Sequence, residues 1–158
     1  MAVVIFRVVD AAAAPNDVAA YASAANNITD HHNYVHDNLL DAGKQFALAA
    51  FMPWCGHCER LTEPQAHARA SEWDRVVEKS PLSIVRVDES AYNRMTNAKE
   101  QCDLSRILSK SVRSFPFVAL VKKDLQNNKI NVFAYDGPYP MTAESILNFF
   151  KSSKSQPF

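Results

Sequence analysis

Apolar and polar residues follow two different periods along this chain, and the alternation between them predicts an α/β fold. Short, nearly continuous apolar runs indicate strands, whereas apolar residues spaced three or four apart indicate amphipathic helices. Strands are predicted at 3–9, 45–52, 82–88, 117–123 and 129–135. Helices are predicted at 15–27, 34–44, 58–77, 102–110 and 143–151. The strand, helix and strand within 45–88 predict a βαβ unit with a right-handed crossover, and therefore two parallel strands.

Individual residues indicate where these elements bend or end. Gly43 suits the position just after a helix, and Thr142 suits the N-cap of the last helix, with Glu144 in a first turn where negative charge favours the helix dipole. Pro64 is expected to kink the helix at 58–77, because proline lacks an amide hydrogen and clashes with the preceding turn. The turn-forming residues 125–128 predict a hairpin between the last two strands.

The N-terminal residues allow two interpretations. A cleaved signal peptide would explain the apolar run and the small residues after it, but Arg7 and Asp10 interrupt the run and no basic region precedes it. The favoured interpretation is a strand followed by a helix that begins at Pro15. Asn27 begins a glycosylation sequon, and such a short match is mostly accidental unless the protein is secreted.

Composition and charge narrow the classes of function. The 158 residues, 47% of them hydrophobic, suffice for one compact domain with its own core. Seventeen basic and seventeen acidic residues leave no net charge, so nothing draws the protein electrostatically onto nucleic acid or anionic lipid. No window approaches the ~18 consecutive apolar residues of a membrane helix. We therefore expect a soluble protein without nucleic-acid or membrane partners.

Two of the three cysteines form a Cys-x-x-Cys pair directly after a predicted strand, in the segment FMPWCGHC at 51–58. Cys55 is expected at the N-terminus of the next helix, where unpaired amide hydrogens and the helix dipole favour a thiolate. Cys58, one turn further on, is expected to be less exposed and to resolve a mixed disulfide. His57 can carry positive charge, which favours the thiolate further and makes the disulfide of the pair an oxidant.

Other interpretations of these residues are open but weaker. A zinc site needs four ligands, and Cys102 with scattered histidines is all that the chain offers as a second half, so we expect no metal. Two packed thiols are the usual interpretation of isolated cysteines, yet a Cys-x-x-Cys beside a βαβ unit favours redox chemistry. His32 and His36 are expected on a solvated helix face. Cys102 and Trp73 are expected to be apolar packing residues.

These segments resemble the thioredoxin superfamily, and within it the catalytic domains of protein disulfide isomerases. FMPWCGHC closely matches the isomerase active-site segment, whose Trp-Cys-Gly-His-Cys sequence is highly specific. VRSFPF at 112–117 resembles the family's Val-Arg-Gly-Phe-Pro-Thr segment, and YDGPYP at 135–140 resembles the usual domain ending. The resemblance implies a thioredoxin fold over 28–151, an α/β domain whose central mixed sheet is flanked by helices. Residues 1–27 are then an N-terminal extension, and 152–158 a C-terminal tail.

The resemblance also implies catalytic roles. Cys55 is the attacking thiol and Cys58 the resolving one, and together they form the redox-active disulfide. Gly56 and His57 belong to the same motif, and His57 tunes the thiolate. Arg113 matches a mobile arginine that approaches the resolving cysteine during proton transfer.

A substrate groove is implied beside the cysteines. The resemblance makes Pro116 a cis-proline that faces the disulfide, although X-Pro bonds are otherwise mostly trans. Backbone next to Pro116 would then pair with an extended substrate segment, so that binding depends little on the sequence of the substrate. Trp54, Phe115 and Pro116 supply an apolar lip to this groove.

The chain also departs from the isomerase pattern. Ala49, six residues before Cys55, replaces a buried glutamate that assists proton transfer from the resolving thiol in the family. Arg86 occupies the place of that glutamate's basic partner. Glu59 replaces a common lysine, and its negative charge should oppose thiolate formation. Ser114 replaces a glycine.

Between Asp88 and Val112 the chain is roughly ten residues longer than the isomerase pattern, and ordered domains seldom carry such an addition without local structure or function. This insertion follows a strand parallel to the one that leads to Cys55. It therefore begins at the same edge of the sheet as the cysteines. A substrate-contacting loop and a neutral extension of the following helix are equally good interpretations.

We expect a thiol–disulfide oxidoreductase that acts on protein cysteines, most simply as an oxidase or isomerase. It would be a monomer without a cofactor, served by an unknown redox partner. The alternatives are a thioredoxin-like reductase, and a chaperone or interaction module with weak turnover, which the loss of the acid at Ala49 makes credible. The resemblance suggests the endoplasmic reticulum or another secretory lumen, although the chain shows neither a clear signal peptide nor a C-terminal retention sequence.

Overall fold

A computed structural model describes residues 6–9, 35–65, 68–87, 89–97 and 102–152. The helix predicted at 15–27, the sequon at Asn27 and the side chain of His32 lie outside these ranges. Among the described residues, none of the helices has the length and apolar character needed to cross a membrane.

One five-stranded sheet forms the centre of the protein, with strands in the order β1, β3, β2, β4, β5. The strands are β1 (Phe6–Val9), β2 (Phe46–Ala50), β3 (Ser83–Val87), β4 (Phe117–Asp124) and β5 (Lys129–Ala134). Strands β2 and β3 are parallel, as the βαβ pattern predicts, and the other neighbouring pairs are antiparallel. The sheet is therefore mixed, and each strand that was predicted is present at least in part.

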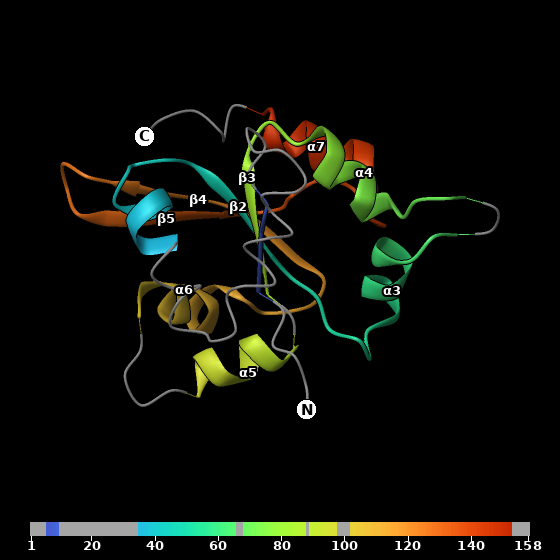
Figure 1. The fold of residues 1–158 in the computed structure, drawn as a ribbon, viewed down its shortest axis with the longest axis horizontal. Helices are drawn as coiled ribbons and strands as arrows, with labels where there is room; N and C mark the ends of the chain where they lie inside the picture. Colours follow the sequence, from blue (N-terminus) through green and yellow to red (C-terminus); the bar gives the residue numbers. More distant parts are fainter. Residues whose placement is uncertain (1–5, 10–34, 66–67, 88, 98–101, 153–158) are drawn as a thin grey trace.

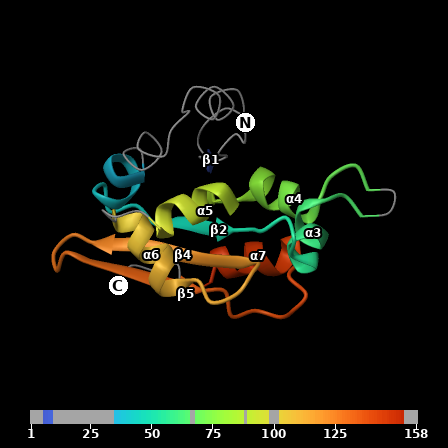
Figure 2. The ribbon, with the colours of Figure 1, turned by 90° about the horizontal axis from the view of Figure 1, so that it is seen from below.

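Helices cover both faces of this sheet (Figure 1). The π-helix η1 (His36–Leu40), α5 (Glu89–Thr96) and α6 (Asp103–Ser111) pack on one face. The helices α3 (Gly56–Thr62), α4 (Glu72–Lys79) and α7 (Ala143–Phe150) pack on the other. Figure 2 shows α3 at the end of the sheet, just beyond the end of β2.

Strand β2 lies between two hydrophobic cores, one on each face of the sheet, and all five of its residues are therefore buried. Phe46, Leu48 and Ala50 belong to the core under η1, α5 and α6. Ala47 and Ala49 belong to the core under α3, α4 and α7. Side chains alternate between the faces of a strand, so a strand covered on both faces reads as a continuous apolar run.

Two predicted helix ends are confirmed by their hydrogen bonds. Gly43 has a φ of +66°, and the amide of Gly43 donates to the Leu40 carbonyl while the amide of Lys44 donates to the Leu39 carbonyl, as in a Schellman motif. At the start of α7 the Thr142 hydroxyl accepts from the Ser145 amide, and the Ser145 hydroxyl accepts from the Thr142 amide. This reciprocal capping box fixes where the last helix begins.

The helix predicted at 58–77 is broken rather than kinked. Helix α3 ends at Thr62, and Glu63 has extended backbone with φ −110° and ψ 144°. The physical reason is Pro64, since proline disfavours helical backbone in the residue before it and donates no hydrogen bond itself. Residues 63–65 and 68–70 lie away from the sheet (Figures 1 and 2), and the next described helix is α4, whose N-cap Ser71 forms a capping box with Asp74.

The inserted segment contains a helix that the sequence analysis did not predict. Helix α5 occupies Glu89–Thr96, buries Met95 almost completely and leaves Tyr92 half-buried. Most of its residues are polar, so the spacing of Tyr92 and Met95 was too weak a pattern to predict an amphipathic helix. The described part of the insertion thus forms a separate helix that packs on α6 and is not an extension of it, and contact of the insertion with a substrate stays a prediction.

Candidate functional site

Cys55 is the N-cap of α3 and follows β2 after a short connection. Its backbone is extended, with φ −93° and ψ 116°, and its sulfur accepts a hydrogen bond from the Cys58 amide at 3.3 Å. The first amides of a helix have no partner within the helix, and here a sulfur takes the place that a side-chain oxygen usually fills. The predicted position of Cys55 at a helix N-terminus is therefore confirmed.

Cys58 lies behind Cys55 in the core. It is 1% exposed, against 9% for Cys55, as expected for the less exposed partner, and both are free thiols. Its sulfur accepts from the Met52 amide at 3.5 Å. Burial raises the pKa of Cys58 to about 12, and the side-chain hydrogen bond with Cys55 acts in the same direction, against the opposing effects of the Met52 amide and the Arg86 guanidinium. Cys58 is consequently a protonated thiol at neutral pH.

The loop before β4 faces Cys55. The Phe115–Pro116 peptide bond is cis, as the resemblance implied, and Pro116 is buried. The Cys55 thiol donates to the Phe115 carbonyl oxygen at 3.5 Å. The loop therefore brings backbone polar groups next to the more exposed of the two sulfurs.

Three aromatic side chains extend outward from this contact. Trp54 is 68% exposed, and its ring meets that of Phe115 edge to face, with centroids 5.9 Å apart. Phe115 in turn meets Tyr92 of α5 edge to face at 5.4 Å. Trp54 and Phe115 were predicted from the sequence to lie together. Tyr92 was missed, and only its place in the insertion pointed toward this edge of the sheet.

Among the described residues, the charged side chain beside Cys58 is a cation, that of Arg86. Ala49 on β2 pairs in register with Arg86 on β3. The guanidinium of Arg86 lies 5.1 Å from the centroid of the Phe51 ring, which packs edge to face on Trp73. Trp73 is 3% exposed and thus a core residue, as predicted. The positive charge of Arg86 lowers the pKa of Cys58, although burial outweighs it.

Other residues of the predicted motif are exposed. Gly56, His57 and Glu59 all face solvent on α3, and apart from its chain neighbours and the nearby helix backbone no atom lies within 4 Å of the place where a Cβ on Gly56 would stand. Arg113 is exposed on the loop before Phe115, and within the described part of the chain no contact joins it to Cys58. The structure thus brings Arg86, and not Arg113, to the resolving thiol.

Cys102 and His36 lie at the other side of the sheet. Cys102 is the N-cap of α6, and its sulfur accepts from the Ser105 amide at 3.4 Å, so it is a capping residue rather than only an apolar one. His36 is partly exposed and contacts Asp41 at 3.2 Å and Asp103 at 3.7 Å. His36, Asp37 and Asp41 are the described residues with the spacing of a cation site, and all three lie at the surface.

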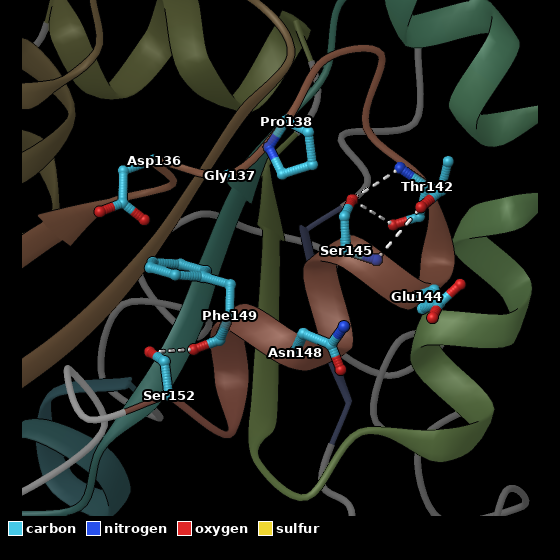
Figure 3. A pocket seen from close by; sticks show the side chains of 9 residues that line it. All are labelled: Asp136, Gly137, Pro138, Thr142, Glu144, Ser145, Asn148, Phe149 and Ser152. Atoms are coloured by element: carbon cyan, nitrogen blue, oxygen red, sulfur yellow. Dashed lines mark hydrogen bonds between the residues drawn. The ribbon is translucent and has the colours of Figure 1, made fainter.

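A hollow of about 450 Å³ lies beside α7 (Figure 3), and its lining includes no cysteine. Its lining runs from Asp136 to Pro138 and along α7 to Ser152. The polar atoms of Thr142 and Ser145 in its wall are bonded to each other in the capping box, and the Ser152 hydroxyl donates to the Phe149 carbonyl. The candidate site is therefore placed at Cys55, where reactive groups converge.

No protein-family model and no curated protein matches this chain. Among solved structures the chain is similar to ERdj5 in crystal form II, with a TM-score of 0.50 and 14% sequence identity. The match covers 78% of this chain and 14% of that one, so this chain spans a small part of the length of ERdj5. Together with the mixed sheet and its flanking helices, the similarity shows a thioredoxin fold.

Proposed function

We propose that this protein is a thiol–disulfide oxidoreductase that acts on protein cysteines, and that it works as a disulfide oxidase or isomerase. The observation that carries the proposal is the arrangement of the two cysteines: a capping sulfur at Cys55 that receives the Cys58 amide, and a buried thiol at Cys58 directly behind it. A nucleophile at the surface with a shielded partner is the arrangement that dithiol exchange requires.

Oxidation of a substrate proceeds in two exchanges. A substrate thiolate attacks the Cys55 sulfur of the oxidised pair, which forms a mixed disulfide and releases Cys58 as a thiolate that takes up a proton. A second substrate thiolate then attacks the substrate sulfur of the mixed disulfide and releases Cys55. Two electrons have passed from the substrate to the pair, and the disulfide of a redox partner must accept them. Isomerisation starts instead with attack by reduced Cys55 and returns it unchanged.

The raised pKa of Cys58 keeps the first exchange from reversing, although a thiol of higher pKa is also a slower leaving group. Because its thiol is protonated at neutral pH, a Cys58 thiolate that leaves the disulfide is quickly quenched and does not attack the mixed disulfide again. The reverse step, in which Cys58 frees a trapped substrate, needs a deprotonated Cys58. Arg86 is placed to favour that form, and Arg113 is the second candidate because it precedes the substrate loop.

The substrate is a polypeptide that lies along the loop before β4. The Phe115 carbonyl, which accepts from the Cys55 thiol, would be released for main-chain hydrogen bonds when Cys55 enters a mixed disulfide, and the exposed Trp54 supplies apolar surface beside the loop that contains Pro116. His57 and Gly56 complete the motif, His57 as a source of positive charge and Gly56 by leaving space beside Cys55. The chemistry needs only sulfur atoms, so we propose no cofactor.

Refolding of a reduced or scrambled disulfide protein tests this function. The oxidised parent should form native disulfides, and Cys55→Ser should abolish this activity because the attacking sulfur is gone. Loss of activity in Cys55→Ser together with normal folding of that variant supports the proposal. Equal recovery of substrate with Cys55→Ser and with the parent would overturn it.

A chaperone or interaction module is the second candidate, and two observations favour it. Ala49 stands where the isomerase pattern has its buried acid, so an acid at this position cannot assist the resolving thiol, and Trp54 is 68% exposed. Such a module would suppress aggregation of an unfolded protein with or without its cysteines. The same variant therefore separates the two functions: Cys55→Ser should retain aggregation suppression only if binding is the function.

A further inference from the structure

Helix α5 lies at the same edge of the sheet as the redox cysteines. Strands β2 and β3 are parallel, and β2 leads to Cys55 whereas β3 leads to α5. The Phe51 amide donates to the Val87 carbonyl at 3.2 Å, so the segments that follow β2 and β3 begin side by side. The carboxyl edge of a parallel pair is where α/β proteins place ligands.

Three aromatic rings connect Cys55 to this helix. The Phe115 carbonyl accepts from the Cys55 thiol at 3.5 Å, and the Phe115 ring lies between those of Trp54 and Tyr92. Both ring contacts are edge to face, with interplanar angles of 86°. We name Trp54, Phe115 and Tyr92 the aromatic row. Its members come from three separate segments and meet only because the fold brings them together.

The position of Tyr92 is set by the packing of its helix against the core. Met95, one helical turn away on α5, is 1% exposed and anchors the helix in the core. Tyr92 itself packs against both hydrophobic cores yet stays half-buried. Its hydroxyl has no hydrogen-bond partner among the residues that the structure describes. The exposed part of the side chain is therefore available to a ligand.

The occupant of this surface follows from the redox chemistry. Any chain in a mixed disulfide with Cys55 must place the residues that flank its cysteine against Phe115, because the Phe115 carbonyl lies beside the Cys55 sulfur. Residues a few positions from that cysteine then reach the ring of Tyr92. The segment that covers the aromatic row is the substrate itself.

The geometry points to Tyr92 as a specificity-determining residue, one that favours substrates with a bulky apolar or aromatic side chain close to the cysteine that Cys55 engages. This inference rests on the proposed function. An aromatic substrate side chain gains edge-to-face contact as well as burial at the row, whereas glycine or serine gains neither. Main-chain contacts alone do not distinguish substrate sequences. The inserted helix would add a preference for particular side chains near the substrate cysteine.

The test uses two peptides of equal length, each with one cysteine in a disulfide with thionitrobenzoate. One peptide carries phenylalanine on both sides of the cysteine, two positions away, and the other carries serine there. The Cys55 thiolate attacks the peptide sulfur, the peptide–Cys55 disulfide forms, and thionitrobenzoate leaves as the better leaving group and is read by its absorbance. The Cys58→Ser background keeps the mixed disulfide from being resolved.

The quantity compared is the rate constant for the phenylalanine peptide divided by that for the serine peptide. We expect this ratio to fall about three- to tenfold in Tyr92→Ala and to stay close to the parent ratio in Tyr92→Phe, which keeps the ring. Tyr139→Ala is the matched control, since Tyr139 is 68% exposed but lies near Tyr135 and outside the aromatic row. It should leave the ratio unchanged.

An unchanged ratio in Tyr92→Ala overturns the inference, whether both rate constants stay at the parent values or both fall by the same factor. Thermal unfolding shows whether Tyr92→Ala is folded, and Tyr92→Gln, which keeps a long side chain without a ring, replaces it if it is not. The parent is also tested with the thionitrobenzoate disulfide of glutathione. No reaction there would mean that the proposed redox function has failed, a result distinct from loss of the preference between peptides.

Discussion

Ala49 and Arg86 lie side by side on the two parallel strands, in register and in contact with the core that contains Cys58. A side chain ending in a methyl group therefore stands where the isomerase pattern has a carboxylate, while the cation beside it is kept. The guanidinium lies over the Phe51 ring and lowers the pKa of Cys58. Loss of the proton from the resolving thiol should therefore depend on these two positions.

Replacing Arg86 with methionine should slow release of a trapped substrate. Without the guanidinium the pKa of Cys58 rises further, because a nearby positive charge favours the thiolate, and the thiolate fraction at a given pH falls. The measurement is the single-turnover decay of a preformed Cys55 mixed disulfide between pH 6 and 9. Arg106→Met, which removes an exposed arginine of α6, is the matched control and should decay like the parent.

Arg113→Ala belongs to the same experiment. If the mobile arginine of the isomerase pattern acts here, this variant also decays slowly, and its effect should be smaller than that of Arg86→Met. Decay of Arg86→Met at the parent's rate throughout this pH range would show that Arg86 plays no part in resolution.

Replacing Ala49 with glutamate should speed the same decay near neutral pH. A carboxylate buried next to Cys58 has a raised pKa and can accept the proton of the thiol. Ala49 is fully buried, so the added acid should also destabilise the protein by about 1–3 kcal/mol, measured by urea unfolding. Ala49→Gln has nearly the same size without the acid, and faster decay in this control as well would rule out proton transfer as the cause.

The stability of the reduced protein should fall as pH rises from 9 to 12. The pKa of Cys58 is about 12 when folded and 9.0 ordinarily, because burial disfavours the thiolate. Above pH 9 the unfolded chain loses this proton first, so the stabilisation present below pH 9 is lost as pH approaches 12. Urea unfolding under reducing conditions at pH 8, 9 and 10 checks this.

Cys58→Ala provides the reference for that titration, since other groups also lose protons in this range. The parent should lose more stability between pH 8 and 10 than the variant does. Parallel losses in the two proteins would contradict the raised pKa of Cys58.

A contact between two helices should matter for stability without affecting the redox site. The carboxylate of Glu72 in α4 accepts from the Ala143 amide at the start of α7, at 2.9 Å. Glu72→Ala should lower the free energy of unfolding by about 1–2 kcal/mol, because a first-turn amide loses its charged partner. Glu78→Ala removes an exposed glutamate from the same helix, and a change within about 0.5 kcal/mol is expected for it. Equal effects of the two substitutions would assign the loss to helix propensity or net charge.

The sheet and the position of the cysteines could be predicted because both depend on local patterns. Strand β2 is a continuous apolar run followed at once by a Cys-x-x-Cys, and that order places Cys55 where strand meets helix. The break after Thr62 was harder, because residues on both sides of Pro64 keep a helical pattern, and only the structure shows that the chain leaves the helix rather than bending within it.

What the sequence could not predict arises where distant segments meet. Tyr92 lies in a mostly polar segment, and nothing local indicates that its ring packs against Phe115. The contribution of Arg86 to Cys58 likewise depends on the register between two strands. The domain bounds and the roles of Gly56, His57 and Arg113 stay predictions.

Equilibration of the protein with glutathione buffers tests whether Cys55 and Cys58 form a redox-active pair. Samples at a series of ratios of reduced to oxidised glutathione are quenched with acid, free thiols are alkylated, and mass spectrometry gives the fraction with a Cys55–Cys58 disulfide. We predict a single two-electron transition with a potential between about −120 and −270 mV, with Cys102 alkylated at every ratio. A pair that stays fully reduced at every ratio, or a disulfide that joins either cysteine to Cys102 instead, would show that Cys55 and Cys58 are not the redox-active pair.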